Sequence, residues 1–134
     1  MMKMKMKMMM MHAEEELSKA AAAGDTERVR GLLSNGVNVN GVNRFGRTAI
    51  QVMMMGNTPV ARLLLEHGAD PNVADPGTGS TPLHDAARTG FTDTVRLLIR
   101  FKADPSAADH SQLRAEDVAL QTGHVDVAEL LRSI

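Results

Sequence analysis

The amino-acid sequence predicts an all-α repeat protein, a solenoid of four helix–turn–helix repeats joined by short turn fingers. Glycines recur at intervals of 32, 34 and 33 residues, at Gly24, Gly56, Gly90 and Gly123. Leucine-rich stretches recur in phase behind them, at 32–33, 63–65, 97–99 and 130–131. A unit of this length cannot bury its apolar face alone, so neighbouring units must stack to form one continuous core.

The composition limits both the core and the chemistry of this chain. Its 134 residues suit one domain, and three Phe without Trp or Tyr leave Leu, Val, Ala and Met to build the core. The absence of Cys excludes disulfides, thiolate metal sites and a cysteine nucleophile. The formal net charge of −1 gives no positive field for nucleic acid or anionic lipid. No apolar run approaches the roughly 18 residues that a membrane span needs.

The N-terminus differs in composition from the rest of the chain. Residues 1–11 contain eight Met and three Lys, a low-complexity run without the features of a secretory signal. Chain termini are where disorder concentrates. We therefore expect residues 1–12 to form a disordered leader outside the fold, and the four repeats to occupy 13–43, 44–76, 77–109 and 110–134.

The third copy shows how each repeat folds. Its residues 81–86 read TPLHDA, which resembles the ankyrin pattern T-P-L-H-x-A. Thr81 is a suitable helix N-cap and Pro82 suits the first helical position. Gly90 can end this first helix with a left-handed backbone. The string therefore predicts an ankyrin solenoid, in which His84 makes a structural hydrogen bond between adjacent turns.

Three departures from this pattern predict local changes. In the second copy Thr48 lies eight residues before Gly56, whereas Thr81 lies nine before Gly90, so the first helix should be shortened. In the fourth copy the Thr and Pro positions hold Arg and Ala, which suits a degenerate terminal cap. Lys102 occupies the position of a glycine in the first two copies, where a left-handed backbone would be strained.

The second copy also resembles a narrower family. Residues 46–47 read GR and 50–56 read IQVMMMG, similar to the second repeat of the ankyrin-repeat inhibitors of cyclin-dependent kinases 4 and 6. Residues 84–94, HDAARTGFTDT, look like the third repeat of the same family. Triple Met beside a one-residue deletion is far more specific than the T-P-L-H string. Four repeats point to the short, inhibitor A/B type.

This resemblance implies a function and a set of contact residues. Members of the family bind the kinase beside its ATP cleft and misalign its lobes, which disfavours active cyclin D complexes and restrains G1/S progression. It implies a monomeric inhibitor of kinases 4 and 6 in the cytoplasm and nucleus. The contact residues carried over by motif, here called the predicted contact residues, are Glu27, Phe45, Gln51, Met53, Met54, Asp75, Asp85, Arg88 and Asp93.

Structural roles compete with binding at several of these residues. Asp75 can be a turn former and Asp93 a helix cap, and both readings stay open. For Asp85, a carboxylate suited to a partner's Arg or Lys is favoured over a merely solvated residue. Met53 and Met54 can fill the space left by the missing residue, offer a deformable apolar contact, or do both.

Other functional classes find little support in the sequence. The His residues never take the i, i+4 spacing of a helical zinc site, and there is no H-E-x-x-H, P-loop or G-x-G-x-x-G motif. We therefore expect no enzyme activity, catalytic residue, cofactor or metal, and no nucleic-acid or membrane partner. The alternative that remains is a generic ankyrin adaptor for a different protein.

Overall fold

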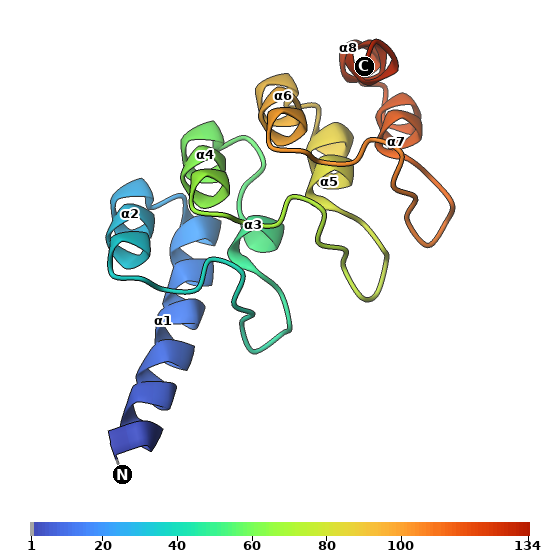
Figure 1. Cartoon of the computed structure of the whole chain (residues 1–134). Coiled ribbons are helices and arrows are strands. Elements are labelled where there is room, and N and C mark those ends of the chain that lie inside the picture. Colours follow the sequence, from blue (N-terminus) through green and yellow to red (C-terminus); the bar gives the residue numbers. More distant parts are fainter. Residues whose placement is uncertain (1) are drawn as a thin grey trace. The chain divides into compact units, whose positions relative to one another are not determined.

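The computed structural model describes residues 2–134, with side chains from His12 onward. Eight α-helices make up the regular structure of these residues, and none of them forms a strand. They divide into two compact units, one ending at Ala69 and the other beginning at Asp70. Figure 1 shows each repeat as a helix pair, with a finger loop before each of the last three pairs.

The first unit holds two helix pairs. Helices α1 (Met2–Ala23) and α2 (Thr26–Ser34) form the first pair, and α3 (Ala49–Val52) and α4 (Thr58–Glu66) form the second. Helix α1 packs on α2 and α3, while α2 packs on α4. This is the stacking that the 33-residue period predicts within the unit.

The second unit repeats the plan. Helices α5 (Pro82–Thr89) and α6 (Thr92–Arg100) are followed by α7 (Ala115–Gln121) and α8 (Val125–Arg132). Helix α5 packs on α6 and α7, and α8 packs on α6 and α7. The predicted all-α ankyrin fold is confirmed; the repeat boundaries given above stay predictions.

The core consists of small and branched aliphatic side chains. Alanines on the first helices of the repeats are buried, and the second helices contribute Val and Leu. The fully or nearly fully buried members include Ala21, Val29, Ala49, Val60, Ala61, Leu64, Ala86, Ala87, Val95, Leu98, Ala119, Val127 and Ala128. Because alanine keeps the first helices thin, neighbouring pairs within a unit approach closely without aromatic side chains.

Helix α5 begins and ends as its sequence predicts. The Thr81 Oγ1 accepts from the backbone N–H of His84 at 3.4 Å, and Pro82 occupies the first helical position. Gly90 ends the helix with φ of 81°. The His84 ring is 1% exposed; its Nδ1 lies 2.8 Å from Thr81 Oγ1 and its Nε2 lies 2.8 Å from the carbonyl oxygen of Leu113 in the next finger. The structural role predicted for His84 is thus confirmed.

Helix α3 is half the length of α5, as the missing residue predicts. It has four residues against eight, and it ends because Met53 takes an extended backbone conformation, with φ of −64° and ψ of 158°. The Gln51 Oε1 accepts from the Thr48 backbone N–H at 2.8 Å, which caps the start of the helix. The chain therefore leaves the helix after a single turn.

The N-terminal run differs from its expected state. We expected residues 1–12 to form a disordered leader; Met1 lies outside the described residues, and the structure places residues 2–12 in the first turns of α1. Met and Lys are both good helix formers. Since the later turns of α1 bury Leu17, Ala20 and Ala21, the run extends a helix that packing already stabilises.

The structure also shows how the chain accommodates the other two departures. Lys102 has a φ of 75°, beside 83° and 92° for Gly36 and Gly68 at the equivalent position after α2 and α4. Helix α7 starts without the Thr-Pro pair. Its N-cap Arg114 instead donates its backbone N–H to the Asp117 carboxylate at 2.9 Å.

Candidate functional site

The tip of the first finger, residues 43–47, presents an exposed aromatic ring. The Asn43 Oδ1 accepts from the backbone N–H groups of Phe45 and Arg47 at 2.9 and 3.1 Å. This Asx turn closes the tip, and Gly46 completes it with φ of 76°. Phe45 is 69% exposed, and the Arg44 guanidinium lies 5.7 Å from its ring centroid. The predicted contact residue Phe45 is thus available to a partner.

The consecutive methionines after α3 point in opposite directions. Met53 is 5% exposed and Met54 is 59% exposed, while Met55 returns to the interior at 8%. The alternation follows from the extended backbone at Met53, because successive side chains of extended backbone face opposite sides. Met54 is therefore the exposed thioether, and the expected surface contact through Met53 does not match its burial, because Met53 fills the core.

Two further predicted contact residues of the first unit have partners of their own. Glu27, in the first turn of α2, is exposed and pairs with the guanidinium of Arg30. Gln51 is half-buried and caps α3, as described above. The Glu27 carboxylate can exchange an exposed pair for a partner's cation at little cost. Gln51 would have to give up the bond that starts its helix.

In the second unit, Asp85 belongs to a small polar network. Its Oδ1 accepts from the Ser80 hydroxyl at 2.9 Å and from Arg88 Nη1 at 2.8 Å. The Asp85 side chain is 31% exposed and that of Arg88 is 45% exposed. These bonds fix the carboxylate while leaving part of it open, an arrangement that favours directed pairing with an incoming cation.

The remaining two aspartates occupy different local settings. The Asp75 Oδ1 accepts from the Gly77 backbone N–H at 2.7 Å, which supports a turn-forming role in the finger 75–80. Asp93 is exposed in the first turn of α6, whose N-cap position is Phe91. The helix-cap reading of Asp93 is therefore wrong, although its carboxylate still lies where the helix dipole favours negative charge.

Two residues beside this set were missed by sequence reasoning. Arg44 contacts the Phe45 ring, and Ser80 donates to Asp85. Arg44 directly precedes the predicted contact residue Phe45, and Ser80 directly precedes the predicted N-cap Thr81. These neighbours were the only features of the sequence that could have indicated the two residues. Besides Phe45, the ring of Phe91 is also exposed, at 44%, directly before α6.

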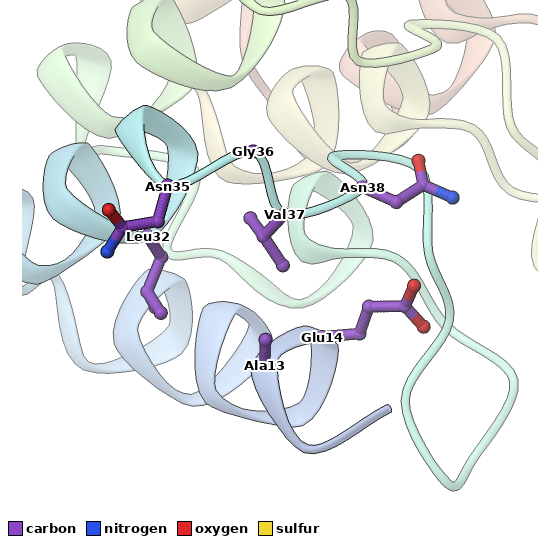
Figure 2. A pocket seen from close by; sticks show the side chains of 7 residues that line it. All are labelled: Ala13, Glu14, Leu32, Asn35, Gly36, Val37 and Asn38. Carbon is purple, nitrogen blue, oxygen red and sulfur yellow. The ribbon is translucent and has the colours of Figure 1, made fainter. Parts of the chain in front are cut away.

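Described residues of the first unit line two hollows on its surface. One is a cavity of about 380 Å³ lined by residues of α1, of α2 and of the segment after α2. Figure 2 shows Leu32 and Val37 pointing toward Ala13 of α1. None of the residues that line this cavity belongs to the predicted contact residues. A second cavity, of about 280 Å³, lies between α1 and the first finger and is bordered by Phe45 and Val52.

Shifted pKa values occur outside the predicted contact residues. The backbone N–H groups of Leu113 and Ser111 hold the pKa of Asp109 below its usual value. Hydrogen bonds from Ser106 lower the pKa of Asp104, and the hydrogen bond from Arg28 lowers that of Glu16. These carboxylates stabilise fingers and helix contacts as acceptors.

The described residues carry neither a metal-binding cluster nor a long apolar helix. Among the described residues, no group of three or more His, Cys, Asp or Glu side chains is placed to hold a metal ion. In the same part of the chain, every helix falls short of the length and apolar character that crossing a membrane requires.

Comparison with known proteins places these features in a family. Residues 13–75 and 56–133 match the family described as ankyrin repeats in three copies. The chain is 54% identical over 121 residues to cyclin-dependent kinase 4 inhibitor B of Homo sapiens, covering 90% of this chain and 88% of that protein. It is 52% identical over 120 residues to the protein of that name from Bos taurus, covering 90% and 92%. Cyclin-dependent kinase inhibitor 2A of Monodelphis domestica is 51% identical over 120 residues, with 90% and 70% covered.

Proposed function

The chain belongs to the ankyrin-repeat family of cyclin-dependent kinase inhibitors, and we propose that it binds and inhibits cyclin-dependent kinases 4 and 6. The observation that carries this function is the 54% identity over 90% of the chain to a kinase 4 inhibitor. The chain is a regulatory binding protein and not an enzyme. Its restraint of the kinases makes it a negative regulator of G1/S progression.

The mode of inhibition follows from thermodynamic linkage. An inhibitor that prefers a kinase conformation with low affinity for cyclin D lowers that affinity, and cyclin D lowers inhibitor binding by the same factor. Such an inhibitor needs only a complementary surface. The half-exposed Asp85 carboxylate supplies a fixed acceptor for a cation, and the exposed Met54 thioether supplies a deformable apolar contact.

The predicted contact residues support this role to different degrees. Exposure favours five of them as direct contacts, namely Glu27, Phe45, Met54, Arg88 and Asp93. Asp85 is a sixth candidate for direct contact, because its side chain is 31% exposed. Met53, Gln51 and Asp75 act through the local structure that they hold, because Met53 is buried and the other two accept bonds from their own helix or turn.

The oligomeric state and the cellular location of the protein form a second part of the proposal. We place it as a monomer in the cytoplasm and nucleus, since a chain of 14.5 kDa is small enough to pass nuclear pores by diffusion. Imaging of the tagged chain in living cells measures this distribution. Exclusion from the nucleus would contradict it.

The test of function is a titration with purified kinase. The chain is added to kinase 4 or kinase 6, alone and with cyclin D, and both binding and phosphorylation of a protein substrate are measured. We expect saturable binding, loss of kinase activity, and weaker binding once cyclin D is present. A folded chain that binds neither kinase would overturn the proposal and favour an adaptor of another protein.

The charge of Asp85 offers a sharper test of the site. Asp85→Asn keeps an oxygen that accepts from Ser80 but removes the negative charge, so we expect kinase binding to weaken by roughly tenfold, about 1.4 kcal/mol. Melting should change little, because the lost pair with Arg88 is partly exposed. A variant that binds normally would remove Asp85 from the contact surface.

A further inference from the structure

The Glu15 carboxylate of α1 contacts the tip of the first finger. The Glu15 Oε1 accepts from the backbone N–H of Arg44, and its Oε2 lies 3.6 Å from Arg44 Nε. The Glu15 side chain is 23% exposed, so it is held against the protein, whereas that of Arg44 is 64% exposed. The Glu15 side chain thus holds Arg44 by a hydrogen bond to its backbone and an ion pair with its side chain.

Arg44 passes this constraint to Phe45. Its guanidinium lies 5.7 Å from the ring centroid, within the range of a cation–π contact. Since Phe45 is 69% exposed, packing on the core contributes little to the orientation of its ring. The orientation therefore depends on Arg44, and the position of Arg44 depends on Glu15.

The orientation of the ring also shapes the surface beside it. Phe45 borders the cavity of about 280 Å³ whose other walls include Ala22 of α1 and Val52 of α3. A ring free to rotate would change the width of this hollow. A partner that packs against Phe45 would then have to order the finger on binding, which lowers affinity.

We infer that Glu15 is a positioning residue for kinase binding, which acts through Arg44 to hold Phe45 in one orientation. The inference rests on the proposed kinase-inhibitor function and deepens it. Helix α1 thus contributes to kinase binding through Glu15, although Glu15 itself need not touch the kinase.

Coupling between Glu15 and Phe45 tests the inference. We expect Glu15→Ala to weaken binding to kinase 4 about fivefold, with an unchanged circular-dichroism spectrum. In a Phe45→Ala background the same change should alter binding less than about twofold, because the ring that it positions is absent. Glu15→Gln should lie between, since its amide oxygen still accepts from the backbone of Arg44 but carries no charge.

Matched variants separate positioning from stability. Glu66→Ala removes an exposed ion pair with Arg62, at 3.9 Å in α4, and should leave kinase binding unchanged. Arg44→Ala should weaken kinase binding as Glu15→Ala does. If Glu15→Ala loses helicity, kinase binding by Arg44→Ala becomes the test of whether this contact positions Phe45. Full additivity with Phe45→Ala, or normal binding by Arg44→Ala, would overturn the inference alone. Failure of the unaltered chain to bind would overturn the proposed function as well.

Discussion

Lys102 has a positive φ of 75°, a backbone conformation that favours glycine. It follows α6 at the place that Gly36 and Gly68 occupy after α2 and α4, and it adopts the same left-handed backbone. Its carbonyl oxygen accepts from the Asn72 side chain at 3.1 Å, so the position also holds the turn that contains Asn72. An L side chain is strained in this conformation, whereas glycine is not.

Lys102→Gly should therefore stabilise the protein. Relief of the strain outweighs the greater entropy of glycine in the unfolded chain, and we expect a gain of about 1 kcal/mol, or roughly 4 °C in melting temperature. The reverse change Gly68→Lys is the matched control. A Cβ there meets no atom within 4 Å, so strain alone should destabilise it by a similar amount. Urea unfolding of both variants measures this; an unstable Lys102→Gly would contradict it.

At the scale of the element, the short helix α3 decides which methionine is exposed. Loss of one residue ends the helix at Met53, whose extended backbone turns Met54 outward and Met55 inward. Alanines 86 and 87 are both buried in the longer α5. Of Met53 and Met54, only Met53 is buried, since the chain has left the helix before Met54.

Substitution of the two methionines should separate stability from binding. Met53→Ala opens a core cavity and should cost about 2 kcal/mol or more, while Met54→Ala should change stability by less than about 0.5 kcal/mol. Kinase binding should respond in the opposite order, with Met54→Ala weakened although fully folded. Chemical unfolding and kinase titration measure the two effects.

The control for this pair is Met53→Leu. It keeps the apolar volume and should cost less than about 1.5 kcal/mol. It keeps binding intact if Met53 acts only by filling the core. A folded Met53→Leu that no longer binds would show a direct contact by Met53 and contradict the burial argument.

For the whole molecule, hydrogen-bonded carboxylates set the response to acid. The pKa values of Glu16, Asp104 and Asp109 are lower in the folded chain than in the unfolded one. A lowered pKa adds stability above the unfolded value, and this stability is lost as pH falls through the folded value. Protonation of the 16 acidic residues also leaves 15 basic residues to repel one another.

Melting temperature should thus stay level from pH 7 to about pH 5 and fall below about pH 4. Asp109→Asn keeps an oxygen for the Leu113 and Ser111 N–H groups but cannot titrate. It should melt below the unaltered chain at pH 7 and match it near pH 3. Circular-dichroism melts at pH 7, 5, 4 and 3 measure the difference. A gap of the same size at every pH would show that Asp109 acts by hydrogen bonding alone.

The repeated helix pairs, the caps of α5 and the shortened α3 were all predictable from the amino-acid sequence alone. Each of these depends on interactions within one or two helical turns, such as a cap or a backbone angle, or on a period that buries one face. Such features depend on residues close together in the sequence or on a regular spacing, so they can be recognised from the sequence alone.

Only the folded structure shows which of the predicted contact residues face solvent and which contacts hold them. The separation of Met53 from Met54 depends on the backbone direction after α3, and the grip of Glu15 on Arg44 joins residues 29 positions apart. The bond from His84 to Leu113 spans the same separation. Such contacts depend on how folded repeats meet within a unit, because stacking brings together side chains that no local pattern relates.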